Sequence, residues 1–344
     1  MKARWKKYTL EFKQPSGTSR GILHSKTSWF IILETNTSRG IGECGYLAGL
    51  SIDPLETYEV VLETLCQSIK RGERPLPSAY REYPSIRMGL EMAYRSLEAE
   101  DPMLLYPSEF TKGQKSIPIN GLVWMGSLDF IQAQIEDKLN EGYDCIKMKI
   151  GSLDFQDEYR LLKALRARYP ADVLTLRVDA NGAYTIDQAQ RVLDALAKIE
   201  VHSIEQPLAA GNIEAMARLC EQSPVPIALD EELIGHSVTN DKAELLTFIK
   251  PQYIILKPSL LGGFTAAEEW IAFASKQACG WWVTSALESN IGLNALAQWT
   301  ATLPTKGPQG LGTGSLYTNN ISGPLAIKNG YLVCANSPAW AIPF

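Results

Sequence analysis

Five charged residues in the second half of the chain recur at nearly regular intervals. Lys149, Asp179, Glu205, Asp230 and Lys257 follow one another at separations of 25 to 30 residues, and each ends a short apolar run. That separation is the length of one strand plus one helix. In a β/α barrel the carboxyl ends of the parallel strands form one rim, where catalytic groups lie. The spacing therefore predicts that all five side chains face one site.

The residue types in this series predict metal-assisted proton transfer. Three carboxylates on adjacent strands would repel one another strongly without a cation between them. Oxygen ligands of this kind suit Mg²⁺, so Asp179, Glu205 and Asp230 are the candidate ligands, with Mn²⁺ as a substitute ion. The ion would hold a substrate carboxylate and stabilise the enediolate that forms when the α-proton leaves. A flanking lysine whose pKa is lowered by nearby positive charge would act as the base.

From Ile117 onward, short runs rich in Val and Ile alternate with amphipathic segments. This alternation predicts right-handed βαβ units and a parallel sheet. Eight units over roughly 200 residues favour a closed (β/α)₈ barrel of the TIM type. The strands are expected at 117–122, 145–150, 175–180, 203–205, 226–230, 253–257, 281–285 and 309–312. Helices are expected between them, among others at 129–141, 154–168, 186–197, 213–220 and 265–278.

The first 113 residues follow a different pattern, which predicts an α+β capping domain. Strand patterns at 5–12, 29–34 and 41–44 precede helical patterns at 55–71 and 85–100. Residues 114–321 would form the barrel, and the strand-and-turn segment 322–344 would return to complete the cap. The predicted fold class is therefore an α/β barrel with an N-terminal α+β capping domain.

The composition is typical of an ordinary enzyme and argues against several other classes. Hydrophobic residues make up 45% of the chain and charged residues 21%. A net charge of -5 argues against binding to nucleic acid, and no apolar run is long enough to span a membrane. The N-terminus lacks the apolar core of a signal peptide, so the expected location is cytoplasmic. The six cysteines are scattered without a C-x-x-C pair, which favours reduced, buried thiols.

The order Lys, Asp, Glu, Asp, Lys resembles that of the enolase superfamily, in its muconate-lactonizing subgroup. The resemblance covers essentially the whole chain and implies a modified, enolase-like barrel. It implies that Asp179, Glu205 and Asp230 are the metal ligands. Lys149, the second lysine of the Lys147-Met-Lys149 motif, and Lys257 on the opposite face would be the catalytic pair.

Finer motifs resemble the o-succinylbenzoate synthase family. The segment 285–292 matches its S-x-x-E-S-x-x-G pattern through Ser285, Glu288 and Ser289, and the segment 84–91 resembles its P-S-V-R-x-G-L-E cap motif. Arg177 matches an arginine that often stands two residues before the first metal ligand. The resemblance implies further supporting or substrate-contacting residues, which are Lys147, Asn181, Gly312 and, in a mobile cap loop, Arg20.

The reaction implied by this resemblance is a dehydration. The substrate would be the small carboxylate 2-succinyl-6-hydroxy-2,4-cyclohexadiene-1-carboxylate, and the product o-succinylbenzoate, on the way to menaquinone. Lys149 would take the α-proton and then protonate the departing hydroxyl on the same face, while Lys257 would stay charged and stabilise the enediolate. The glycine-rich segment 310–314 and Ser285 could offer hydrogen-bond donors to the succinyl carboxylate.

Two other interpretations stay open. An N-succinylamino acid racemase or a dipeptide epimerase of the same subgroup would use the same two lysines as alternating bases. Dipeptide epimerases typically carry D-x-D where this chain has Gly312-Thr313-Gly314, which argues against that activity. A catalytically silent barrel would be expected to have lost a lysine or a metal ligand. The sequence does not indicate the oligomeric state, and a homo-oligomer is one option.

Overall fold

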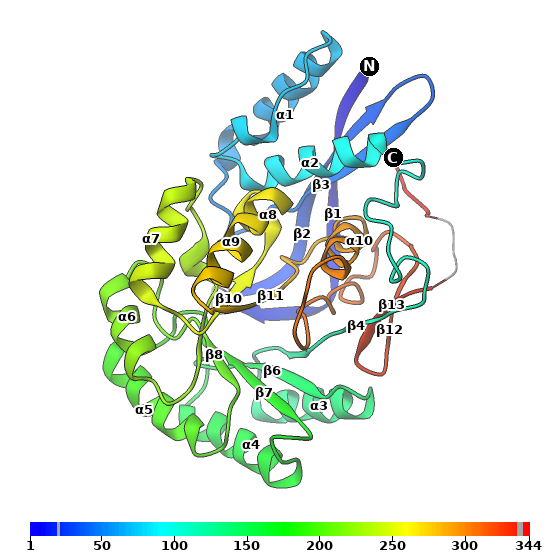
Figure 1. Ribbon diagram of the computed structural model, residues 1–344. Coiled ribbons are helices and arrows are strands. Elements are labelled where there is room, and N and C mark those ends of the chain that lie inside the picture. The colour runs from blue at the N-terminus through cyan, green and yellow to red at the C-terminus, as the bar shows by residue number, and fades with distance from the viewer. Residues whose placement is uncertain (19–20, 336–339) are drawn as a thin grey trace.

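The computed structural model describes residues 1–18, 21–335 and 340–344, with the backbone alone for residues 15–18. Figure 1 shows two parts, an antiparallel sheet with two helices at the top and a curled parallel sheet with surrounding helices below. No helix in these described ranges is long and apolar enough to cross a membrane. The predicted residue Arg20 and part of the predicted cap loop lie outside the described residues.

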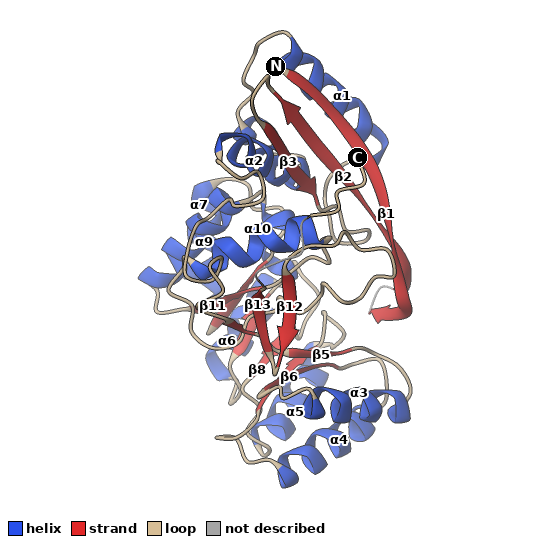
Figure 2. Cartoon of the chain, turned by 90° about the vertical axis from the view of Figure 1, so that its right-hand side faces the viewer, coloured by secondary structure: helices blue, strands red, loops and turns tan. Residues whose placement is uncertain are grey.

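The N-terminal sheet consists of three antiparallel strands, β1 (Lys2–Thr18), β2 (Gly21–Glu34) and β3 (Arg39–Cys44). Two helices pack on it, α1 (Leu55–Lys70) and α2 (Pro84–Glu98), joined through the short 3-10 helix η1 (Pro77–Ala79). Figure 2 shows the long β1–β2 hairpin running from this region down beside the barrel. Strand β3 and helix α2 approach so closely that a Cβ at Gly42 would lie 1.8 Å from the Gly89 carbonyl oxygen. Glycine at this position is what allows the contact.

The second helix begins one residue earlier than expected. Pro84 is the first residue of the helix, where the backbone N–H that proline lacks would have no partner within the helix. Ser85 therefore lies inside the helix and is not its N-cap residue. The Ser85 hydroxyl instead donates to Asp53 at 2.6 Å, which ties the helix start to the loop before α1.

The parallel sheet contains seven strands in sequential order. They are β5 (Gly121–Val123), β6 (Cys145–Lys149), β7 (Thr175–Asp179), β8 (Ser203–Glu205), β9 (Ile227–Leu229), β10 (Tyr253–Leu256) and β11 (Gly280–Val283). Nearly all their residues are buried, as expected for strands covered on both faces. This confirms the predicted α/β barrel class with an N-terminal α+β cap, although the regular sheet holds seven strands rather than eight.

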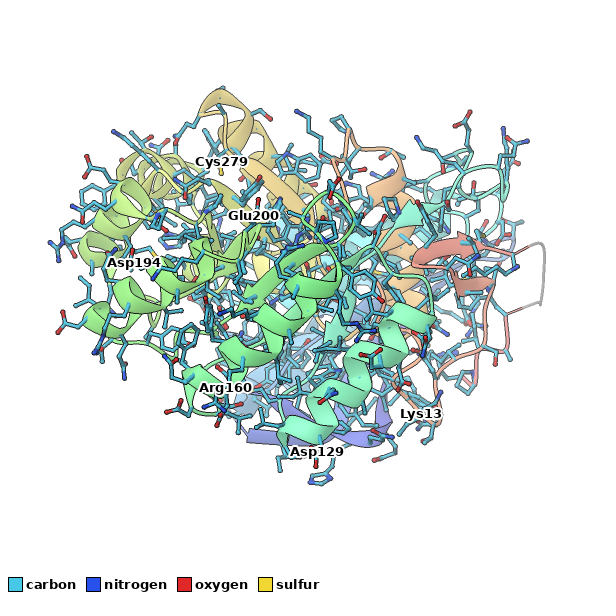
Figure 3. The ribbon with its side chains drawn as sticks, turned by 90° about the horizontal axis from the view of Figure 1, so that it is seen from below. Lys13, Asp129, Arg160, Asp194, Glu200 and Cys279 are labelled. Atoms are coloured by element: carbon cyan, nitrogen blue, oxygen red, sulfur yellow. The ribbon has the colours of Figure 1, made fainter. Side chains whose placement is uncertain are left out.

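Helices surround the sheet on its outer side (Figure 1). They are α3 (Leu128–Asn140), α4 (Phe155–Arg168), α5 (Ile186–Ala197), α6 (Ile213–Gln222), α7 (Thr239–Ile249), α9 (Phe264–Lys276) and α10 (Asn290–Ala301). Two short helices follow strand ends, η2 (Glu231–Leu233) and α8 (Pro258–Leu261). Figure 3 shows Asp129, Arg160 and Asp194 on α3, α4 and α5 with their exposed side chains on the outside. The amphipathic segments therefore turn their polar faces to solvent.

The predicted eighth strand, 309–312, forms only isolated bridges. Gly310 pairs with Thr284 next to β11, and Gln309 pairs with Ile119 before β5, so a few hydrogen bonds complete the ring. A Cβ at Gly310 would lie 2.4 Å from the Thr284 hydroxyl oxygen, which explains the glycine. Pro308 and the glycines that follow do not sustain a regular strand.

The C-terminal hairpin of β12 (Leu325–Lys328) and β13 (Tyr331–Cys334) pairs with β4 (Ile117–Pro118), just before the first barrel strand. The last residue reaches the N-terminal sheet. The Phe344 ring lies 4.7 Å from that of Phe30, and its carbonyl oxygen accepts a hydrogen bond from Arg39. The C-terminal segment thus contacts both parts, and the boundaries at 113 and 321 stay a prediction.

Candidate active site

Strand register places the predicted site residues in one row. Lys149 pairs with Asp179, and Asp179 pairs with Glu205, across β6, β7 and β8. Asp230 directly follows β9, and Lys257 directly follows β10. Because residues in register share a face of the sheet, these side chains point to the same side at the carboxyl ends of the strands.

The lysines and the carboxylates are in direct contact. Lys147 Nζ lies 2.6 Å from both carboxylate oxygens of Glu205 and 3.0 Å from Asp179 Oδ2. Lys149 Nζ lies 3.2 Å from Asp179 Oδ2 and donates to Asn181 Oδ1 at 2.7 Å. Lys257 forms an ion pair with Asp230. The structure therefore brings together all five residues of the series, with Lys147 and Asn181 beside them.

Burial and mutual attraction set the charges at this site. Burial alone would lower the pKa of Lys257, but attraction to Asp230 and Glu205 outweighs it and raises that pKa. Burial and the neighbouring Asp179 raise the pKa of Glu205 to about 8, against the opposing effect of Lys147. Burial would also raise the pKa of Asp179, yet the three lysines hold it well below its usual range. The raised pKa of Lys257 agrees with its expected role as a lasting positive charge, because carboxylates are its nearest charges. The lowered pKa expected for the lysine base depends on a bound divalent ion and stays a prediction.

The three acids suit a hard divalent cation in their chemistry. Asp179, Glu205 and Asp230 are each at most 2% exposed and offer only oxygen donors from adjacent strands. Burial together with a like charge raises the Glu205 pKa, and a nearby cation would offset both effects. In the part of the chain that the structure describes, however, no three His, Cys, Asp or Glu side chains are already arranged around a metal position. Lysine ammonium groups contact the acids instead, and metal binding stays a prediction.

A cavity of about 480 Å³ opens above this row. Lys147, Lys149, Asp179, Asn181 and Lys257 line its base. Apolar residues of the cap, the first barrel strand and the loops after β11 form much of the remaining wall, and helix α3 adds polar residues such as Gln134 and Asp137. The other lining residues include Leu23, Leu47, Leu50, Leu122, Trp124, Ser285, Leu287, Gly312, Thr313 and Leu316. An apolar cavity with a few convergent charges suits a small organic carboxylate.

Arg177 does not line this cavity, and its predicted role as a supporting or substrate residue stays a prediction. It stands two residues before Asp179 on the same face of β7, one layer deeper in the barrel. Its guanidinium lies 4.0 Å from the centre of the Trp282 ring, and Nη1 donates to the Pro308 carbonyl at 2.9 Å. Arg177 therefore packs the barrel interior and holds the segment that closes the ring.

Glu288 and Ser289 also lie behind the cavity wall rather than in it. Both are 0% exposed. The Ser289 hydroxyl donates to Glu43 of β3 at 2.5 Å, and the Gly292 N–H donates to the same carboxylate at 2.8 Å. Glu43 thus holds the start of α10 against the cap. These two predicted residues therefore join the two parts of the molecule, and their supporting role at the site stays a prediction.

Residues of the first barrel strand were missed as site residues. Lys149 Nζ lies 5.9 Å from the centre of the Trp124 ring. Asn120 is 4% exposed, lines the cavity, and its Oδ1 has no hydrogen-bond partner among the residues described. Asn120, Leu122 and Trp124 all line the cavity. They are two residues apart in and next to strand β5 and therefore share one face, so this spacing could have predicted them from the sequence.

Comparisons with known proteins agree with this geometry. Residues 131–340 match the family model described as enolase C-terminal domain-like. A curated o-succinylbenzoate synthase from Desulfotalea psychrophila is 44% identical, covering 96% of this chain and 98% of the relative. The crystal structure of MenC from that organism superposes with a TM-score of 0.87 at 41% identity, covering 97% of this chain and 99% of the other. An N-succinylamino acid racemase from Thermus thermophilus is 29% identical over 83% of this chain and 78% of its own.

The chain is a member of the enolase superfamily, as the family-model match over residues 131–340 and the shared barrel and cap show. The extent of its identity to the Desulfotalea psychrophila relative is more specific. The chain belongs to the o-succinylbenzoate synthase family.

Proposed function

We propose that this protein is an o-succinylbenzoate synthase, a hydro-lyase that dehydrates 2-succinyl-6-hydroxy-2,4-cyclohexadiene-1-carboxylate to o-succinylbenzoate in menaquinone biosynthesis. The observation that carries the proposal is the pair Lys149 and Lys257, which lie on opposite sides of the carboxylate row and line one cavity. Near-complete alignment with the curated synthase supports the same reaction.

Lys149 performs both proton transfers. As the free amine it takes the proton from the carbon that carries the ring carboxylate, and the electron pair moves into that carboxylate as an enediolate. The electron pair of the enediolate then returns to form the ring double bond between the two carbons as the C–O bond breaks. The ammonium gives its proton to the departing 6-hydroxyl, so the products are o-succinylbenzoate and water. Contacts with Asp179 and Asn181 hold the Lys149 amine at the base of the cavity.

Lys257 provides a fixed positive charge on the other side. Attraction by Asp230 and Glu205 raises its pKa, so it stays an ammonium near neutral pH. A buried charge of this kind is already oriented before the reaction and stabilises the negative charge as it develops. The apolar wall formed by Leu47, Leu50 and Leu316 excludes water from the same space.

Asp179, Glu205 and Asp230 would hold a divalent cation, for which we propose Mg²⁺ with Mn²⁺ as a substitute. When bound, the ion supplies positive charge that stabilises an enediolate. The three acids provide its oxygen ligands, and Lys147 keeps Glu205 and Asp179 oriented toward the same point.

The N-succinylamino acid racemase relative makes racemisation the second candidate activity. Lysines on both sides of one cavity could remove and return a proton on either face. Purified protein assayed with the cyclohexadiene substrate should form o-succinylbenzoate, and EDTA should abolish this activity until Mg²⁺ is restored. Incubation with N-succinyl amino acids in D₂O is the companion assay. Fast α-deuterium exchange with racemisation, together with negligible dehydration, would reject the synthase assignment.

The expected location is the cytoplasm. All six cysteines are free thiols, and five of them are buried, as suits a reducing compartment. A homo-oligomer stays an open prediction, which sedimentation of the purified protein would settle.

A further inference from the structure

The hydroxyl of Ser285 has no hydrogen bond left to offer a ligand, although Ser285 lines the cavity. Its proton goes to Glu288 Oε2 at 2.6 Å. Its oxygen accepts from the Leu287 N–H at 3.0 Å and from the Thr313 hydroxyl at 2.8 Å. A serine hydroxyl has one donor and two acceptor positions, so all three are in use. The expected role of Ser285 as a donor to the succinyl carboxylate is therefore not available in this arrangement.

Glu288 fixes the direction of this chain of hydroxyls. Its second oxygen accepts from the Ser259 hydroxyl at 2.5 Å, so the carboxylate receives a hydrogen bond on each side. An ionised carboxylate only accepts hydrogen bonds. Ser285 must donate to it, and Thr313 must in turn donate to Ser285.

The charged groups around Glu288 come from the cap. Lys26 of β2 and Glu43 of β3 are nearly or fully buried beside it, and Tyr317 lies close enough for Glu288 to contribute to its raised pKa. Burial raises the pKa of Glu288, while Lys26 and the two serine hydroxyls act in the opposite direction. Lys26 donates to Ser28 at 3.1 Å, and Ser28 donates to Glu43 at 2.7 Å. Burial is the largest of these effects, so the pKa of Glu288 lies above its ordinary value. The direction of the hydroxyl chain therefore rests on the two short hydrogen bonds that the Glu288 oxygens accept from Ser259 and Ser285.

Thr313 stands at the cavity end of this chain. Its proton is committed to Ser285, and its hydroxyl oxygen accepts no hydrogen bond from the residues described. Thr313 also lines the cavity. It therefore presents hydrogen-bond acceptor positions, and no donor, to a bound molecule.

We propose that Thr313 contacts the substrate as a hydrogen-bond acceptor and that Glu288, acting through Ser285, is the positioning residue that keeps it an acceptor. The inference rests on the proposed function, because the cyclohexadiene substrate carries one hydroxyl donor and its product carries none. Thr313 then binds the hydroxyl before it leaves. After dehydration the same oxygen faces a molecule with only acceptor groups, which favours product release.

Two variants test this directly. Thr313→Val removes the acceptor and nearly preserves the volume, and Thr313→Ser retains it. Loss of one neutral hydrogen bond should raise KM for the substrate about fivefold in Thr313→Val and little in Thr313→Ser. The affinity for o-succinylbenzoate, measured by titration calorimetry, should not fall. Equal weakening of substrate and product, or no change in KM, would overturn the inference while leaving the synthase assignment intact.

Glu288→Met tests the positioning role, because it removes both acceptors without adding a donor. Ser259 can still donate to Met88 Sδ, which lies 3.2 Å away, and Ser285 is left with Thr313 as its acceptor. The chain should reverse, Thr313 should donate into the cavity, and o-succinylbenzoate should bind about fivefold more tightly. This gain should vanish in the Glu288→Met/Thr313→Val double variant. A gain that persists there, or weaker product binding in a folded Glu288→Met protein, would contradict the proposal. A wild type that neither forms nor binds o-succinylbenzoate would instead reject the proposed function, and the inference with it.

Discussion

Lys147 Nζ lies 2.6 Å from each carboxylate oxygen of Glu205, so one ammonium spans the whole carboxylate. Both side chains are almost fully buried, at 6% and 2% exposure. Removing one partner of such a pair leaves an uncompensated buried charge. Lys147 therefore supports the site by holding Glu205 in place, and its charge opposes the rise in the Glu205 pKa that burial and Asp179 cause.

Lys147→Met should destabilise the metal-free protein strongly. The free energy of unfolding measured with urea should fall by about 3–5 kcal/mol, the cost of breaking a buried pair. Lys138→Met is the matched control, because its partner Glu141 is half exposed and their pair should contribute little. The double variant Lys147→Met/Glu205→Met should recover most of the loss. An equal effect of the two single variants would rule out this role for Lys147.

Mg²⁺ should stabilise the folded protein through the three acids. An ion that binds only the folded state at a hundred times its Kd adds about 2.7 kcal/mol to the free energy of unfolding. Thermal unfolding should therefore shift upward when MgCl₂ replaces EDTA at equal ionic strength, and the shift should disappear in Glu205→Gln. The exposed variant Glu141→Gln should keep it. A shift that survives in Glu205→Gln would place the ion elsewhere.

Asp53 gives the stability of the cap a defined pH dependence. Burial raises its pKa from 3.8 to about 6, despite hydrogen bonds from Ser85. Between these two pKa values the folded state binds more protons than the unfolded state, so stability from this group falls as pH rises through that window and is lost above pH 6. Asp53→Asn cannot ionise and so lacks this pH dependence. The change in free energy of unfolding that it causes should be about 1 to 2 kcal/mol more favourable at pH 8 than at pH 5. Urea titrations at both pH values check this, and a difference independent of pH would contradict it.

Asn120 should contribute to substrate binding and not to the stability of the fold. Asn120→Leu removes a buried amide oxygen that has no partner among the described residues, so the free energy of unfolding should stay equal or rise. KM for the cyclohexadiene substrate should increase about fivefold if the amide binds substrate. Asn294 is a matched control, because its amide donates to the Met103 carbonyl at 2.9 Å inside the protein. Asn294→Leu should lose stability with KM unchanged. The reverse pattern would remove Asn120 from the binding site.

The parts of the structure that were predictable from sequence depend on local patterns. Each of the charged residues from Lys149 to Lys257 follows a short buried run, and the period of two places Lys147 beside Lys149. The same patterns predicted a strand at 309–312, which the structure does not contain. Gly310 is required there by its close contact with Thr284, and a contact with a residue so far along the chain leaves no local pattern in the sequence.

Long-range hydrogen bonds decide where other predicted site residues lie. Arg177 is predicted from its match to a family arginine two residues before the first metal ligand, yet its hydrogen-bond partner Pro308 is 131 positions away. Ser285 reads as a ligand donor until Glu288 and Thr313 are seen to use all of its hydrogen bonds. Neither set of partners follows from periodicity, since both depend on how the ring of strands closes.

Rapid-quench measurement of dehydration by Lys149→Ala tests the central claim most directly, with the wild type and Lys257→Ala assayed alongside. Loss of a general base typically costs about 10² to 10⁴ in rate, and Lys149→Ala should lose at least that much kcat while retaining its fold by circular dichroism. Lys257→Ala should also be slow, because it leaves the developing charge without its fixed ammonium. If Lys149→Ala dehydrates the cyclohexadiene substrate at the wild-type rate, then Lys149 does not transfer the proton and the mechanism derived from this site is wrong.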